Sequence, residues 1–182
     1  MNISLLFLVI FFVSLEAVPA QVLIIRHGEK PPEGNHLNVR GWERAYALVP
    51  FFQGRQDLLV FGKPFAIYAM GQLREDSSLR PIETVRLLAE TLKIPLITNF
   101  KHYQFPEMAN EILRRSEYEG KSILICWEHK SINDIAKALG VKEDLKKWKG
   151  AIYDRVYKLT YKNGAVEFEN LPQRLLFGDS DS

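Results

Sequence analysis

Three distant segments of the chain carry arginine and histidine side chains that could together bind and transfer a phosphoryl group. Arg26 and His27 are adjacent and precede Gly28, which could let the backbone come close to a ligand, whereas Arg80 and His129 stand far along the chain. A phosphoryl group in transfer carries negative charge on several oxygens, so catalysis depends mainly on positioning it and stabilising that charge. A guanidinium group matches phosphate oxygens and keeps its proton. A neutral imidazole could act as nucleophile, neighbouring arginines lower its pKa, and a second histidine could donate to the phosphate.

The elements that must position these side chains alternate between strands and helices. Residues 22–25 and 121–127 are apolar segments typical of buried parallel strands, and residues 65–69 and 96–98 predict two more. Helices are expected from the N-cap Asn38 to about Phe52 with Gly54 ending it, from Pro81, from Pro106, and after Ser131. Ligands of such sheets bind beyond the carboxyl ends of the strands. Arg26, His27 and His129, which follow two strands, should therefore share one edge.

The last third of the chain has a different pattern. Ser131 and Asp134 have the spacing of a capping box, and Gly140 follows as a helix stop. Asn163-Gly164 between two strand-like segments predicts a hairpin. The whole pattern predicts an α/β fold, a three-layer sandwich with a largely parallel central sheet flanked by helices and a C-terminal β-hairpin. We expect one domain over residues 21–182, with a loose tail from about residue 178.

The motifs resemble those of the histidine phosphatase superfamily, also called the phosphoglycerate mutase-like family. Residues 22–29 (VLIIRHGE) resemble its signature, and residues 78–84 are similar to its second motif of a serine, an arginine and a helical threonine. Residues 37–45 look like its first helix, and residues 123–129 (ILICWEH) look like its late strand and second histidine. The similarity spans nearly all of residues 21–182 in family order, in a compact, phosphatase-type form.

The resemblance implies a role for each of the four side chains. His27 would take the phosphoryl group as a covalent phosphohistidine, and Arg26, Arg80 and His129 would bind its oxygens. A water molecule would then hydrolyse the intermediate, without a metal or other cofactor.

The resemblance also implies a proton donor for the leaving oxygen, which in the family is often an acid between the second motif and the late strand. Glu107 is the candidate, although a glutamate is favoured in a first helical turn in any case. That position lowers a carboxyl pKa, whereas a general acid needs it raised. Glu128 is the rival, and some relatives lack such an acid.

Other chemistry-bearing residues are given structural or surface roles. Arg40, Arg44 and Arg74 are expected to be solvated or paired on the surface, and His36 and His102 have no motif support. The four histidines fit no common metal-ligand spacing. Lys130 could add charge at the pocket rim or face solvent. The expected core residues are Cys126, Trp127, Trp148 and Tyr153.

Length, composition and charge limit the classes of protein to which this chain could belong. The chain has 182 residues, of which 47% are hydrophobic and 25% charged, enough for one folded domain. Its formal net charge is +2, whereas nucleic-acid binding would call for a stronger basic excess. With one cysteine, no internal disulfide is possible.

The first twenty residues resemble a secretory signal. Residues 3–13 are almost wholly apolar, and Val18-Pro19-Ala20 supplies small residues for cleavage after Ala20. The apolar segment is short for a membrane span, which needs about 20 residues. No Lys or Arg precedes it, so a retained anchor or a buried first helix is the alternative. We expect an exported protein, periplasmic or secreted, without stable membrane insertion after cleavage.

These expectations converge on a phosphatase that hydrolyses a small-molecule or peptide-borne phosphomonoester. A phosphoglycerate mutase-type phosphotransferase is the enzymatic alternative, although such mutases carry longer insertions. A catalytically silent module that binds phosphorylated ligands is the alternative of a different class.

Overall fold

A six-stranded sheet with helices on both faces forms the protein in the computed structural model, which describes residues 18–180. The strand order is β3-β2-β4-β1-β5-β6. Four strands are parallel, and the last two form an antiparallel hairpin: β1 (Gln21–Arg26), β2 (Ala66–Ala69), β3 (Leu96–Ile97), β4 (Ser122–Trp127), β5 (Arg155–Lys162) and β6 (Ala165–Pro172). The helices are α1 (Val39–Gly54), α2 (Arg80–Leu92), α3 (Phe105–Arg114) and α4 (Ile132–Ala138), with short 3-10 turns at Gln56–Leu58 and Ser116–Tyr118. The predicted fold class and hairpin are confirmed.

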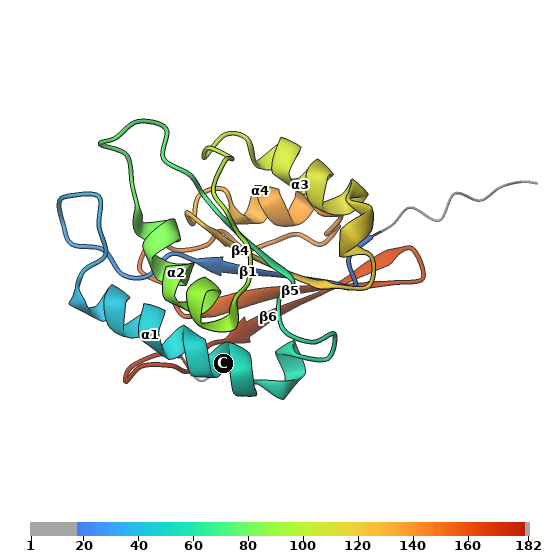
Figure 1. Cartoon of the computed structure of the whole chain (residues 1–182), viewed down its shortest axis with the longest axis horizontal. Coiled ribbons are helices and arrows are strands. Elements are labelled where there is room, and N and C mark those ends of the chain that lie inside the picture. The colour runs from blue at the N-terminus through green and yellow to red at the C-terminus, as the bar shows by residue number, and fades with distance from the viewer. Residues whose placement is uncertain (1–17, 181–182) are drawn as a thin grey trace, which may run out of the picture.

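Two apolar cores lie on the two faces of the sheet. Helices α1 and α2 cover one face and α3 and α4 the other (Figure 1). Successive side chains of a strand point to opposite faces, so Leu23 and Ile25 pack toward α1 and α2, whereas Val22 and Ile24 pack toward α3 and α4. The central strands are buried on both sides, which explains why they are continuous apolar segments rather than alternating ones.

The parallel register brings the ends of three strands to one edge of the sheet. Arg26 at the end of β1 lies opposite Trp127 at the end of β4, and Ala69 at the end of β2 lies opposite Cys126. The backbone N–H of His27 continues the ladder by donating to the carbonyl of Trp127 at 3.0 Å. The segments that follow β1, β2 and β4 therefore leave the sheet side by side.

Most local predictions are confirmed. The Asn38 side chain caps α1 by accepting the backbone N–H of Gly41 at 2.8 Å. Positive φ angles of 52° at Asn163 and 76° at Gly164 make the tight hairpin turn. The capping-box prediction is wrong, because the Ser131 hydroxyl makes no cap bond and instead donates to Glu128 at 2.6 Å.

The predicted signal segment lies mostly outside the described residues, so cleavage after Ala20 stays a prediction. Ala20 itself extends the central strand β1. Its N–H donates to Lys121 at 2.9 Å and its carbonyl accepts from Tyr161 at 3.0 Å. Over residues 18–180, no helix combines the length and the apolar character needed to cross a membrane.

A loose tail was predicted from about residue 178, but residues 178–180 are held against the fold by hydrogen bonds. Asp179 accepts two hydrogen bonds from Arg44, at 2.9 and 2.8 Å, and two from the backbone N–H groups of Leu175 and Leu176. Ser180 then donates to Asp154. The predicted surface position of Arg44 is also wrong. It is only 1% exposed and also binds Glu29, a partner set that no local sequence pattern reveals.

Replacing Asp179 with alanine should destabilise the fold. Burial raises the pKa of the Asp179 carboxyl, but the Arg44 and backbone donors outweigh burial and hold it below its usual value. Breaking a buried ion pair of this kind costs about 3 kcal/mol of unfolding free energy. The stabilisation by this ion pair is fully present at pH values above the usual carboxyl pKa. It is lost as the pH falls through the lowered pKa of Asp179.

Denaturant unfolding at neutral pH measures this loss, with the exposed Asp144→Ala as the matched control. The control should change the free energy of unfolding by less than about 0.5 kcal/mol. Equal behaviour of the two variants would mean that the C-terminal segment is not anchored as described.

Candidate active site

A cavity of about 570 Å³ lies at the carboxyl edge of the sheet and brings together the four predicted residues Arg26, His27, Arg80 and His129. They come from the end of β1, the first residue of α2 and the turn after β4. The remaining residues of the wall are Lys30, Met70, Gly71, Leu73, Ser77, Ser78, His102, Glu128 and Lys130.

Arg26 is buried beneath this cavity and held by neutral oxygens. Its Nη1 donates to the carbonyls of Gly150 at 2.7 Å and Ile152 at 2.8 Å. Burial lowers the pKa of its guanidinium from the usual value, partly offset by the fields of Tyr153 and Glu128. Its Nε is buried without a hydrogen-bond partner within residues 18–180. A buried donor without a partner is energetically costly, so it is a position where a ligand oxygen would be stabilising.

His27 is held in one tautomer. Its Nδ1 lies 2.7 Å from the carbonyl oxygen of Gly28, which can only accept, so Nδ1 carries the proton and donates it. The lone pair of the neutral ring is therefore on Nε2. That nitrogen is the one free for nucleophilic attack.

The surroundings of His27 keep it uncharged. Burial is the main cause that lowers its pKa, to about 3, and the bond to Gly28 partly opposes this. The positive fields of Arg26 and Arg80 and the neighbouring His129 lower the pKa further. His27 is therefore neutral throughout the physiological pH range.

Arg80 joins α2 to the loop before α1. Its Nε donates to the carbonyl of His36 at 3.0 Å, and its Nη2 donates to the carbonyl of Gly34. Like Arg26, it is held by backbone oxygens and keeps its full positive charge. The Thr84 hydroxyl accepts the Gly28 N–H at 2.8 Å and donates to the Arg80 carbonyl at 2.7 Å, so it ties the two motifs together.

His129 follows β4 and is half-buried in the cavity wall. Burial and then the charge of Arg26 lower its pKa, Glu128 opposes this, and Lys130 and Lys30 lower it further. A neutral His129 still has one ring N–H to donate to a phosphate oxygen.

Tyr153 is a site residue that sequence reasoning placed in the core. Its ring lies 3.7 Å from the guanidinium carbon of Arg26 and meets the His27 ring edge-on, with centroids 6.1 Å apart. Such cation–π stacking orients an arginine without cancelling its charge. No motif indicated Tyr153, which follows β4 by more than twenty residues. Trp127 and Trp148 are buried core residues, as expected.

Lys30 and His102 also line the cavity without having been singled out. The position of Lys30, three residues after His27, was an available signal. His102 lies in the loop before α3, where no motif marks it. His36 instead binds the Glu83 carboxylate at 2.5 Å.

The two candidate proton donors are placed differently. Glu107 is exposed in the first turn of α3 and is not part of the cavity wall. Glu128 is in the wall, but its two oxygens accept from the Lys130 N–H at 2.9 Å and the Ser131 hydroxyl at 2.6 Å. It therefore serves as a local cap for the turn before α4.

Gly28 has a different role from the one expected. A Cβ atom there would lie 2.9 Å from the carbonyl oxygen of Gly41, so glycine lets the His27 loop pack on α1. The close approach is to the protein's own backbone rather than to a ligand.

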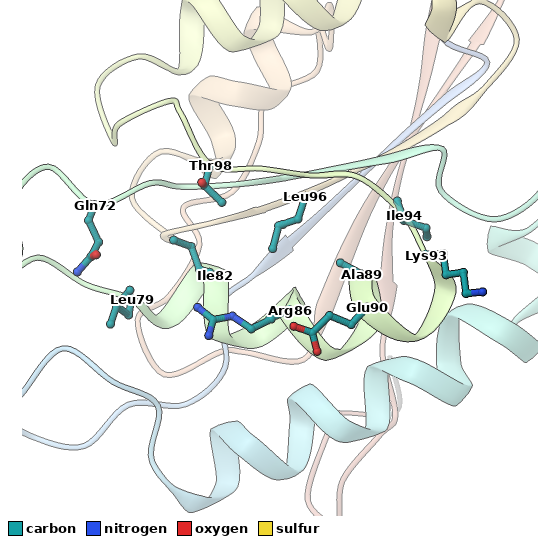
Figure 2. Close-up of a pocket in the computed structure, with 10 residues that line it drawn as sticks. All are labelled: Gln72, Leu79, Ile82, Arg86, Ala89, Glu90, Lys93, Ile94, Leu96 and Thr98. Atoms are coloured by element: carbon teal, nitrogen blue, oxygen red, sulfur yellow. The ribbon is translucent and has the colours of Figure 1, made fainter.

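A separate groove of about 750 Å³ lies between α2 and the edge strand β3. Figure 2 shows Ile82 and Ala89 of α2 on one side and Leu96 of β3 on the other. Its wall contains no histidine, cysteine or hydroxyl nucleophile other than Thr98. Within residues 18–180, no three His, Cys, Asp or Glu side chains cluster as metal ligands would.

Comparison with solved structures places the fold among histidine phosphatases. The protein histidine phosphatase SixA, solved with tungstate, superposes with a TM-score of 0.57 at 13% identity, over 84% of this chain and 97% of its own. An Escherichia coli protein assigned as an alpha-ribazole-5'-P phosphatase gives 0.57 at 14% identity, over 87% and 98%. A phosphoserine phosphatase from Entamoeba histolytica, in complex with phosphoserine, gives 0.52 at 12% identity, over 86% and 99%. Comparison with family models and with curated proteins finds no match.

The lowered pKa of His27 predicts a pH-dependent cost to stability. In the unfolded chain this histidine takes up a proton near pH 6.5, whereas in the folded protein it stays neutral down to about 3. As the pH falls between these values, the unfolded state binds more protons and the folded state loses stability, by up to about 1.4 kcal/mol per pH unit.

The comparison is with His27→Asn, which cannot titrate. The unfolding free energy of the wild type, relative to this variant, should fall steadily between pH 6 and 4 in phosphate-free buffer. A difference that stays constant over this range would show that His27 is not held neutral.

Proposed function

We propose that the protein is a phosphatase that hydrolyses phosphomonoesters through a covalent phosphohistidine on His27. The observation that carries this proposal is the pairing of a free Nε2 on a neutral imidazole with two guanidinium groups that form no ion pair within residues 18–180. A phosphate dianion in this cavity would meet Arg26 and Arg80, and these planar donors suit its oxygens.

The reaction follows from this placement. Nε2 of His27 attacks phosphorus, the phosphorus–oxygen bond to the leaving group breaks, and the leaving group departs with that electron pair. Arg26, Arg80 and the N–H of His129 stabilise the charge on the three remaining oxygens. Water then attacks phosphorus, the phosphorus–nitrogen bond breaks, and inorganic phosphate leaves with His27 neutral again.

Neither candidate acid is placed to protonate the leaving group. Glu107 lies outside the cavity wall, and both oxygens of Glu128 already accept hydrogen bonds. The site therefore favours esters whose leaving group departs readily as an anion, such as aryl phosphates. A peptide-borne or small-molecule phosphoester of this kind is the proposed substrate.

The apolar segment before Ala20 supports export, because its length and small terminal residues fit a cleaved signal. We place the protein outside the cytoplasm, periplasmic or secreted. A hydrolase that releases phosphate suits such a location better than a mutase that isomerises a metabolite.

The first test is turnover of p-nitrophenyl phosphate by wild type and variants. His27→Ala should abolish turnover with the fold retained, and Arg80→Ala should lower kcat/KM by about 10²–10³-fold, as expected for lost transition-state donors. The matched control is Arg74→Ala, an exposed arginine in the preceding loop that is absent from the cavity wall.

Acid quench with ³²P-labelled substrate should trap acid-labile label on His27. A wild type that binds phosphoesters but turns over none of a broad panel would favour a binding module. Isomerised phosphoester without free phosphate would favour a mutase.

The second test varies the leaving group. Without a free acid in the cavity wall, kcat/KM should fall steeply as the leaving-group pKa rises across substituted phenyl and alkyl phosphates. Glu107→Gln should leave this slope unchanged. A shallow slope that steepens in Glu107→Gln or Glu128→Gln would identify that residue as the proton donor.

A further inference from the structure

We propose that Lys30 and Lys130 form a second anion site in the same cavity, so that the natural substrate is a small phosphomonoester carrying an additional anionic group. The proposal rests on the proposed phosphatase function and names its substrate class.

The two lysines reach the cavity from different segments of the chain. Lys30 lies in the loop between β1 and α1, three residues after His27, and Lys130 directly follows His129 in the turn before α4. Both belong to the cavity wall. Both also lower the pKa of His129, because their positive charges lie near its imidazole.

Neither ammonium group is neutralised by the protein. Over residues 18–180, Lys30 and Lys130 form no ion pair, whereas Lys158 and Lys162 each bind a glutamate at 2.8 Å. Glu128 is the one acidic residue in the cavity wall, and its oxygens face the Lys130 N–H and the Ser131 hydroxyl.

The positive charge of the cavity wall exceeds what one phosphate dianion neutralises. The wall holds the cations Arg26, Arg80, Lys30 and Lys130 against the single carboxylate of Glu128. A phosphate dianion offsets two of these positive charges and leaves the cavity wall with net positive charge. A second anion on the substrate, beside the two lysines, would relieve the mutual repulsion of the cations.

The size of the cavity is consistent with a small organic group between the two anions. Its volume of about 570 Å³ exceeds what a phosphate fills, and Met70 and Leu73 add apolar wall. Both lysines are exposed, so each attraction is modest and is screened by salt. The site should therefore act as a preference between substrates and not as an absolute requirement.

The test compares two aryl phosphates whose phenol leaving groups have nearly equal pKa values: phenyl phosphate and 4-(carboxymethyl)phenyl phosphate. At low salt, wild-type kcat/KM should be about tenfold higher for the carboxylate substrate. Lys30→Gln/Lys130→Gln should bring the ratio of the two kcat/KM values to about one, whatever its effect on the turnover of phenyl phosphate itself. The matched control is Lys63→Gln/Lys142→Gln, two exposed lysines outside the cavity wall, which should keep the preference.

Equilibrium binding of both compounds to His27→Ala, by calorimetry, separates this proposal from the proposed function. If the wild type turns over neither compound, the phosphatase proposal fails, and the ratio of the two dissociation constants still decides the anion site. Equal affinity of His27→Ala and equal wild-type turnover for both compounds, or a loss that is equal for both in the double lysine variant, would overturn the second anion site.

Discussion

The site depends on holding two arginines with backbone carbonyl oxygens instead of carboxylates. Arg26 is fixed by the carbonyls of Gly150 and Ile152 and by the Tyr153 ring, and Arg80 by those of Gly34 and His36. Carbonyl oxygens orient a guanidinium group but leave its net charge in place. The charge therefore remains available to a phosphate and to the neighbouring imidazole.

Arg44 shows the opposite arrangement in the same protein. It is buried like Arg26, but Glu29 and Asp179 neutralise it and raise its guanidinium pKa despite burial. Glu29 stands two residues after His27, where an unpaired carboxylate would weaken the positive field of the cavity. Glu29 is instead paired with Arg44 and Arg40. The fold thus separates a neutralised arginine, which stabilises the structure, from two charged ones.

The sequence could predict the convergence of Arg26, His27 and His129 because strand ends of a parallel sheet meet at one edge. It could predict Arg80 only through the resemblance, since an arginine before a helix is usually solvated. Tyr153 and Arg44 escaped prediction because their partners lie far along the chain, across contacts set by tertiary packing. Glu107 was placed correctly in the first turn of α3, but the buried face of that helix is formed by Met108, Ala109 and Ile112, which leaves Glu107 outside. Gly28 was correctly expected to allow a close approach, but to Gly41 instead of a ligand.

The most direct test of the central claim is a crystal structure with vanadate, which can bind as a trigonal-bipyramidal mimic of a phosphoryl group in transfer. We expect one vanadium atom bonded to Nε2 of His27, with its oxygens within hydrogen-bonding distance of Arg26, Arg80 and His129. Vanadate bound elsewhere, or bound in the cavity without contact to Nε2 of His27, would contradict the account.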